Sequence, residues 1–255
     1  MLKKYFSFLV LFLLTTSIFG QLEYNEKQFL ISPVASIGFP LIANQNNYGY
    51  SELAYKVKPG GHIGVMFGFE KYLKTSFKVG ILYAFQGQNY KDVIYGLDHE
   101  KDISLNYIQI PFIYKYVLGA AKGYDLDALR HYVFAGGQLG YLVNAKMSFS
   151  RDGKKVDFLD FVSYHDKNTN LEEIKANGIP INAENFFTSF DFGINLGYGL
   201  QYFLEQRMYI FTELTAYMGM IDINNEKWRF RNNKRAYSGS LNVYGGLRFG
   251  VTYLP

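Results

Sequence analysis

The sequence predicts an all-β fold, an eight-stranded antiparallel up-and-down transmembrane β-barrel with long extracellular loops. Three observations predict it: an N-terminal segment typical of exported proteins, strands whose two faces differ in chemistry, and connections that alternate between long and short. After the N-terminal segment, no apolar run reaches the roughly 20 residues that a membrane helix needs, so membrane insertion must use strands. We therefore expect an integral protein of the cell outer membrane in a Gram-negative envelope.

The clearest two-faced strand is 186–203. Read with a period of two, one face is large and apolar, with Phe190, Phe192, Ile194, Leu196, Tyr198, Leu200 and Tyr202. The other face is small or polar, with Asp191, Gly193, Asn195, Gly197, Gly199 and Gln201. A soluble barrel would turn the large apolar face inward and leave the glycine-rich face to water. In a membrane barrel lipid solvates the apolar face and the narrow lumen takes the small residues, which fits this pattern better.

Residues 1–20 have the pattern of a signal peptide. Lys3 and Lys4 precede an apolar stretch at 5–14, and weaker residues follow up to Gly20. A single-pass anchor is the alternative, but the apolar stretch is shorter than a membrane helix requires. We expect one outer-membrane β-barrel domain over residues 21–255. The chain has no cysteine, which excludes disulfides and thiolate metal sites.

Seven further segments have strand character, at 28–39, 60–70, 77–85, 104–118, 131–144, 207–221 and 239–254. The connections at 40–59, 87–102, 145–185 and 222–238 are long, and those at 70–74, 119–130 and 204–206 are shorter. In outer-membrane barrels long connections are extracellular and short ones periplasmic, and we expect the same here. Pro111 lies within a strand of a barrel that has no edge, so we expect a bulge or an unpaired rung there.

One strand carries a family resemblance. The run Tyr107-Ile108-Gln109-Ile110-Pro111-Phe112-Ile113-Tyr114-Lys115-Tyr116 resembles the hallmark strand of the PorT-like outer-membrane β-barrel family. Supporting matches are Ala135-Gly136-Gly137, Asp191-Phe192-Gly193 with Gly197 and Gly199, and Glu213 with Tyr217 and Gly219. The resemblance implies an eight-stranded outer-membrane barrel and no particular reaction. PorT itself is tied to protein secretion, so the resemblance also implies an envelope or secretion protein as a partner.

The function that the pattern favours is that of a structural or binding and assembly module acting through its extracellular loops. Eight strands enclose only enough room for side chains, which argues against a general pore. We expect no enzyme, no cofactor and no metal site, because His62, His99, His131 and His165 show no nucleophile or metal spacing. The alternatives are an outer-membrane enzyme acting on lipid and an accessory component of a protein secretion system. Without Lys3 and Lys4 of the signal peptide, 24 basic and 22 acidic residues remain, and a formal net charge of about +2 gives no indication of nucleic-acid binding.

Polar residues on the inner faces predict a lumenal plug, made of Gln86, Gln109, Lys115, Asp191, Asn195, Gln201, Glu213 and Arg248. If 207–221 and 239–254 pair as a hairpin with Arg207 near Leu254, then Glu213 lies opposite Arg248. We therefore predict a lumenal ion pair between these two residues.

The densest basic run is 227–235. Extended, it places Lys227, Arg229 and Arg231 on one face, with Trp228 and Phe230 on the other. Guanidinium and ammonium groups just above the acyl boundary can bind the phosphates of lipopolysaccharide. We predict this contact, and with it outer-membrane lipid and lipopolysaccharide as partners; a solvated loop with incidental charge stays open as the alternative.

Overall fold

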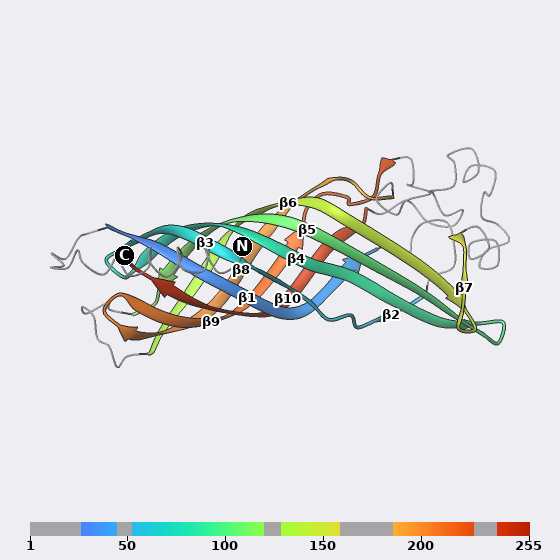
Figure 1. Cartoon of the computed structure of the whole chain (residues 1–255), viewed down its shortest axis with the longest axis horizontal. Coiled ribbons are helices and arrows are strands. Elements are labelled where there is room, and N and C mark those ends of the chain that lie inside the picture. The colour runs from blue at the N-terminus through green and yellow to red at the C-terminus, as the bar shows by residue number, and fades with distance from the viewer. Residues whose placement is uncertain (1–26, 45–52, 120–128, 159–185, 227–238) are drawn as a thin grey trace, which may run out of the picture.

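The computed structural model describes residues 27–44, 53–119, 129–158, 186–226 and 239–255. Its strands are β1 Lys27–Ala43, β2 Ala54–Lys56, β3 Gly60–Lys71, β4 Thr75–Ile94, β5 Leu97–Val117, β6 Leu129–Arg151, β7 Lys154–Val156, β8 Phe190–Glu205, β9 Met208–Gly219 and β10 Leu241–Tyr253. They form an elongated barrel, and β4, β5 and β6 run past the other strands at one end (Figure 1). No helix within the described ranges is long and apolar enough to cross a membrane.

Eight of these strands close into a ring. The order is β1, β3, β4, β5, β6, β8, β9, β10 and back to β1, and every neighbouring pair is antiparallel. The two short strands lie off the ring, where β2 pairs with β4 and β7 pairs with β6. The predicted eight-stranded antiparallel up-and-down barrel is confirmed, and each of the eight predicted segments supplies one ring strand.

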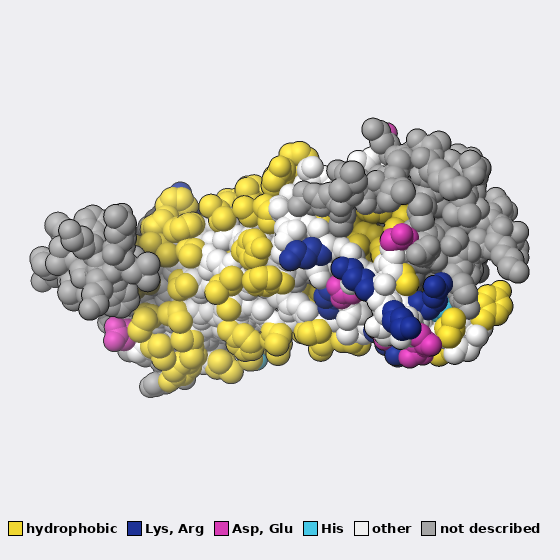
Figure 2. Space-filling model, turned by 45° about the vertical axis from the view of Figure 1, so that its right-hand side comes forward, with side chains coloured by type: hydrophobic (Ala, Val, Ile, Leu, Met, Phe, Trp, Pro, Cys, Tyr) yellow, Lys and Arg dark blue, Asp and Glu magenta, His cyan; other side chains and the backbone are white. Residues whose placement is uncertain are grey.

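The two faces of the strands separate as predicted. On β8 the side chains of Phe190 and Leu196 are 67% and 54% exposed, whereas those of Asp191 and Asn195 are each 3% exposed. Figure 2 shows apolar side chains spread over the outside of the barrel wall. Because lipid solvates this outer surface, the large apolar side chains need no partner within the chain.

The segment 87–102, predicted as a long loop, is instead a continuation of β4 and β5. Cross-strand pairing extends to Ile94 and Leu97, and the turn consists of Tyr95 and Gly96, with φ angles of 52° and 79°. Two positive φ angles are typical of a type I′ turn, whose twist matches that of a hairpin. The prediction was wrong because polar residues such as Asn89 and Lys91 were taken as loop residues.

A second hairpin extends the wall within the predicted loop 145–185. β6 continues to Arg151, turns at Asp152 and Gly153, with φ angles of 53° and 72°, and pairs with β7. An Asp-Gly pair is a strong signal for this turn type. The first part of that predicted loop is therefore strand, and so are residues 54–56 of the predicted loop 40–59.

Pro111 leaves an unpaired rung, as predicted. On the β4 side the ladder has Val79 opposite Phe112 and next Leu82 opposite Gln109, so the intervening rungs are missing while the register is unchanged. On the β6 side Pro111 keeps a partner. The bulge lies elsewhere, at the register shift between Asn106 and Tyr107 of β5. Loss of one N–H donor is thus accommodated without a change of register at the proline.

Two apolar clusters fill opposite ends of the interior. The first contains Leu30, Leu73, Val117, Phe203 and Leu254, near the short turns between β3 and β4 and between β8 and β9. The second lies where β4, β5 and β6 extend, and contains Tyr90, Ile103, Leu105, Phe149, Phe158, Phe187 and Ile223 among others. The polar lumenal residues lie on the strands between them.

Two predictions fall on residues outside the described ranges. The signal peptide at 1–20 is one, so the domain boundary at residue 21 stays a prediction. The basic run at 227–235 is the other, and the lipopolysaccharide contact of Lys227, Arg229 and Arg231 likewise stays a prediction.

Candidate functional site

The lumen of the barrel is lined with buried polar side chains. All eight residues predicted for the lumenal plug are at most 7% exposed: Gln86, Gln109, Lys115, Asp191, Asn195, Gln201, Glu213 and Arg248. They come from β4, β5, β8, β9 and β10, so most of the ring contributes. The alternation of each strand brings these groups together, because every second side chain points into the barrel.

Glu213 and Arg248 are brought together at the centre of this lining. They are direct cross-strand partners of β9 and β10, and the Arg248 guanidinium donates to the Glu213 carboxylate in a buried ion pair. The other carboxylate oxygen, Oε1, accepts a hydrogen bond of 2.8 Å from the Tyr132 hydroxyl. The guanidinium also lies over the Phe134 ring, 5.1 Å from its centroid. Each charge therefore has a partner inside the membrane-spanning wall.

A second network lies closer to the short turns. The Lys115 Nζ donates to Glu70 Oε2 at 3.2 Å, to Gln201 Oε1 at 2.8 Å and to the Tyr209 hydroxyl at 3.2 Å. The Tyr209 hydroxyl in turn donates to Glu70 Oε2 at 2.9 Å. Sequence reasoning missed Glu70, which was assigned to the turn. Its even spacing from Gly64, Met66 and Gly68 on the inner face was the signal that could have found it.

A third network is centred on Asp191. Its Oδ2 accepts hydrogen bonds from the Tyr217 hydroxyl at 3.0 Å and from Asn242 Nδ2 at 2.9 Å, and Asn242 Nδ2 also lies 3.2 Å from the Tyr107 hydroxyl. Next to it, Asn195 donates to Gln138 Oε1 at 2.6 Å. The role of Tyr107 in this network was not predicted.

The glycines of β8 make room for these inward tyrosines. A Cβ at Gly199 would overlap the Tyr132 ring, and a Cβ at Gly193 would overlap the Tyr217 ring. The small face of β8 is thus complementary to large rings from β6 and β9. Because these rings fill the space beside β8, the glycine face leaves no open channel along that wall.

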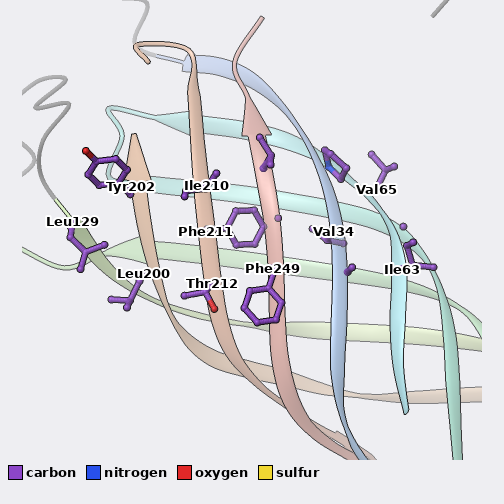
Figure 3. A pocket seen from close by; sticks show the side chains of 15 residues that line it. Val34, Ile63, Val65, Leu129, Leu200, Tyr202, Ile210, Phe211, Thr212 and Phe249 are labelled. Atoms are coloured by element: carbon purple, nitrogen blue, oxygen red, sulfur yellow. The ribbon is translucent and has the colours of Figure 1, made fainter. Parts of the chain in front are cut away.

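An apolar hollow lies on the outside of the wall, not in the lumen. Most of its lining side chains point outward, among them Ile63, Val65, Ile210 and Phe249 on neighbouring strands (Figure 3). Its lining is almost wholly apolar, as expected where acyl chains of the membrane contact a barrel. We therefore assign it to the lipid-facing surface.

In outer-membrane barrels the end opposite the short turns is extracellular. We therefore call the extension of β4, β5 and β6 at that end, together with β2 and β7, the extracellular arm, residues 54–56, 87–104 and 145–156. Its inner face packs on the apolar cluster of Tyr90, Ile103 and Phe149, and its outer face is polar. Figure 2 shows charged side chains gathered at this end. The arm therefore has the two-faced pattern of a soluble sheet, apolar inside and polar outside.

Ion pairs cross the outer face of the arm. Lys58 Nζ lies 2.7 Å from Asp102 Oδ2, and Lys91 Nζ lies 3.0 Å from Asp98 Oδ2 and 2.9 Å from Glu100 Oε1. Hydrogen bonds to Glu100 and Asp98 raise the pKa of Lys91 above its ordinary value. On the inner face of the arm, burial lowers the pKa of Lys101 to about 7. The outer face also holds a groove of about 240 Å³ lined by Lys56, Asn89, Glu100 and Ser148 among others.

The histidines do not form a catalytic or metal constellation in the described part of the chain. His62 packs against Tyr244, with ring centroids 5.4 Å apart, and His99 Nδ1 lies 3.0 Å from the Leu97 carbonyl oxygen. His131 pairs with the Tyr198 hydroxyl. Within the same ranges no group of three or more His, Cys, Asp or Glu side chains could hold a metal ion. His165 lies outside the described residues.

Comparison with solved structures finds other outer-membrane proteins. Neisserial surface protein A is 12% identical, with 89% of this chain and 97% of that chain covered and a TM-score of 0.42. Outer membrane protein W of E. coli is 11% identical over 91% of this chain and 100% of that chain, with a TM-score of 0.40. Ail, the attachment invasion locus protein of Yersinia pestis, is 8% identical over 89% and 98%, with a TM-score of 0.36. Similarities this distant carry no statement about binding or activity, and no curated protein matches the chain.

The family of the chain follows from a family model. The model described as outer membrane protein beta-barrel domain matches residues 29–225, which is most of the chain. The matched region begins in β1 and extends past β9, so it contains seven of the eight ring strands. The protein is accordingly an integral protein of the outer membrane, and it belongs to the outer membrane protein beta-barrel domain family.

Proposed function

We propose that the protein is a binding and assembly module of the outer membrane that presents its extracellular arm to an envelope partner and does not act as a general pore. The observation that carries this proposal is the arm itself. β4 and β5 stay paired from Gly87 opposite Ser104 out to Ile94 opposite Leu97. A barrel needs only a short connection to close, so this excursion has no role in closure.

Packing on its inner face holds the arm in one conformation. Its inner face packs against Leu53, Phe158, Phe187 and Ile223, which come from segments outside β4, β5 and β6. Burial of these side chains fixes the arm from several directions, and apolar packing of this kind is what makes a surface segment rigid. A rigid arm presents the same outer face to every partner, which lowers the entropic cost of binding.

The packed lumen supports the proposal that the protein does not act as a general pore. The ion pair of Glu213 with Arg248 and the network of Glu70, Lys115 and Tyr209 cross the interior at different levels. Breaking either network would leave a buried charge without its partner, which is costly. We expect purified protein to give no sustained ion conductance in planar bilayers.

The stretch Tyr107–Tyr116 of β5 supports the assignment to a narrower family. This stretch, which resembles the PorT-like hallmark, forms the membrane-spanning part of β5 and supplies Tyr107, Gln109 and Lys115 to the lumen. We propose a PorT-like barrel on this motif, with an accessory role in protein secretion as the second candidate function. Lipopolysaccharide is proposed as the lipid neighbour on the sequence of Lys227, Arg229 and Arg231 alone.

Crosslinking in native outer membranes tests the role of the arm. Replacing 88–103 by Asn-Gly connects Gly87 to Ser104, which are cross-strand partners, through a two-residue turn, and so shortens the arm without changing the register below it. We expect the shortened variant to remain a closed barrel, whose gel mobility changes on boiling. We also expect it to lose the protein neighbours that crosslink to the full chain. The Tyr95→Asn variant, which keeps the arm at full length, is the control. An unchanged set of neighbours in the shortened variant would refute the proposed function.

A further inference from the structure

Three lysines stand together on the outer side of the barrel at its periplasmic end. Lys27 begins β1, Lys71 ends β3, and Lys74 closes the turn into β4. Lys27 and Lys71 are direct cross-strand partners, and both side chains are exposed on the lipid-facing side. Like charges directly opposite each other destabilise a strand pair. In the described part of the chain, no carboxylate forms an ion pair with any of the three.

Directly above the lysines lies a row of aromatic side chains. Phe29, Phe69, Phe77 and Tyr114 are successive cross-strand neighbours on β1, β3, β4 and β5, and each is 39–54% exposed. Such a row marks the boundary between acyl chains and headgroups. The lysine row therefore lies at the depth of the lipid phosphates.

The ammonium groups are held in place by rings. Lys27 Nζ lies 4.4 Å from the centroid of Phe69, Lys71 Nζ lies 5.0 Å from that of Tyr72, and Lys74 Nζ lies 5.2 Å from that of Tyr116. Lys74 Nζ also donates to the Gly119 carbonyl oxygen at 2.7 Å. Each ammonium has three donors, so donors stay available on the side away from its ring.

The turn between β3 and β4 fixes the spacing of two of the lysines. The Lys74 amide donates to the Lys71 carbonyl oxygen at 3.0 Å, and both Tyr72 and Leu73 have φ angles of 53°. Left-handed conformations are uncommon for such residues and persist only when the surroundings hold them. Here the buried Leu73 side chain, 4% exposed, anchors the turn in the apolar cluster that also contains Leu30 and Leu254.

We propose that Lys27, Lys71 and Lys74 bind the phosphodiester headgroup of a phospholipid in the periplasmic leaflet. The phosphate would lie between the facing Lys27 and Lys71 and neutralise their repulsion, while the acyl chains continue along the aromatic row. A phospholipid is the occupant because this end carries the short turns and thus faces the periplasm, whose leaflet consists of phospholipids. Basic side chains near a membrane surface attract anionic lipids in this way. The site is independent of the proposed function of the arm.

Native mass spectrometry of the full-length mature protein in neutral detergent tests the site. The probes are phosphatidylglycerol, a diacylglycerol with the same acyl chains, and inorganic phosphate. We expect wild type to retain phosphatidylglycerol, and the Lys27→Gln/Lys71→Gln variant to bind it roughly 25-fold more weakly, since each of the two lysines contributes about a fivefold factor. Diacylglycerol and inorganic phosphate are expected to bind wild type only weakly. Their affinity should not exceed that of the Lys27→Gln/Lys71→Gln variant for phosphatidylglycerol.

Two matched variants make the test specific. Lys27→Arg/Lys71→Arg keeps both charges and is expected to retain the lipid. Lys154→Gln/Lys155→Gln removes two exposed charges from β7 at the other end and is expected to bind like wild type. Equal binding by wild type and Lys27→Gln/Lys71→Gln would overturn the proposal. So would an equal loss in the β7 variant, or inorganic phosphate binding as tightly as the lipid, which would indicate an adventitious ion only.

Thermal unfolding provides a second readout that does not depend on recovering a complex. In neutral detergent, Lys27→Gln/Lys71→Gln is expected to unfold at a higher temperature than wild type, because the repulsion is removed. On addition of phosphatidylglycerol, wild type is expected to gain more than the variant, because only wild type binds the phosphate. Equal gains in both proteins would contradict the site even if the variant folds less efficiently.

Discussion

Arg248 of β10 lies directly opposite Glu213 of β9, and their side chains form an ion pair inside the barrel with 1% and 5% of their side-chain surfaces exposed. The carboxylate is completed by the Tyr132 hydroxyl. Removing one partner of a buried pair leaves the other charge uncompensated, at a cost of about 3–5 kcal/mol. The pair thus ties the last hairpin of the barrel to β6.

A double-mutant cycle measures this coupling. Arg248→Ala and Glu213→Ala are each expected to lower the free energy of unfolding by up to about 3–5 kcal/mol, and the double variant by much less than the sum. Urea unfolding in detergent gives the three values. Tyr132→Phe, which removes only the hydroxyl, is expected to cost about 1–3 kcal/mol. Additive losses for Arg248 and Glu213 would show that the two side chains do not interact.

A glycine comparison tests the packing of tyrosines against β8. Gly199→Ala is expected to destabilise the barrel by about 1–3 kcal/mol, because the new methyl group overlaps the Tyr132 ring. Gly245→Ala is the matched control, since no atom lies within 4 Å of a Cβ built there. The unfolding midpoints of the two variants measure this difference in stability. Equal stability would mean that the ring of Tyr132 is not packed on β8.

The folded arm is expected to become less stable as the pH falls. Burial lowers the folded-state pKa of Lys101 to about 7 from 10.5, so folding disfavours its charged form. The resulting penalty is absent above pH 10.5, grows as the pH falls through this window, and is constant below about pH 7. Lys101→Met removes the penalty. Limited proteolysis of the arm should show the variant gaining protection over wild type at pH 6 and little at pH 10; a pH-independent difference would contradict this reasoning.

The tip of the arm contains a residue that its turn does not favour. Tyr95 has a φ angle of 52° and a side chain that is 78% exposed, whereas the corresponding residue of the β6–β7 turn is Asp152. Asparagine adopts this conformation more readily, so Tyr95→Asn is expected to stabilise the hairpin by about 0.5–1 kcal/mol. Slower hydrogen exchange at Ile94 and Leu97 would report it. Faster exchange would mean that the Tyr95 ring has a stabilising contact at the tip.

The sequence was sufficient for the membrane-spanning part of the barrel. There the alternation of large apolar and small polar residues has one meaning, because lipid lies outside and a narrow lumen inside. The register of β9 and β10 followed from the lengths of the two strands, and it places Glu213 against Arg248 as expected.

The arm could not be predicted from this alternation, because beyond the bilayer the apolar residues face inward and the polar residues face outward. Tyr90, Ile103 and Leu105 face inward and are apolar, whereas Asn89, Asp102 and Ser104 face outward and are polar. Water replaces lipid at that height, so the outer face becomes the polar one. A polar stretch between two membrane strands was therefore taken for a loop. The tyrosine partners in the lumen were missed for a related reason, since only the fold shows which rings the β8 glycines admit.

The most direct test of the account is the accessibility of the arm from outside intact cells. The chain has no cysteine, so Tyr95→Cys and Gln206→Cys each introduce a single thiol, one at the tip of the arm and one in the turn between β8 and β9. A membrane-impermeant maleimide is expected to label Tyr95→Cys on intact cells and to label Gln206→Cys only after the outer membrane is permeabilised. Labelling of Gln206→Cys but not Tyr95→Cys on intact cells would contradict the orientation, and with it the display of the arm at the cell surface.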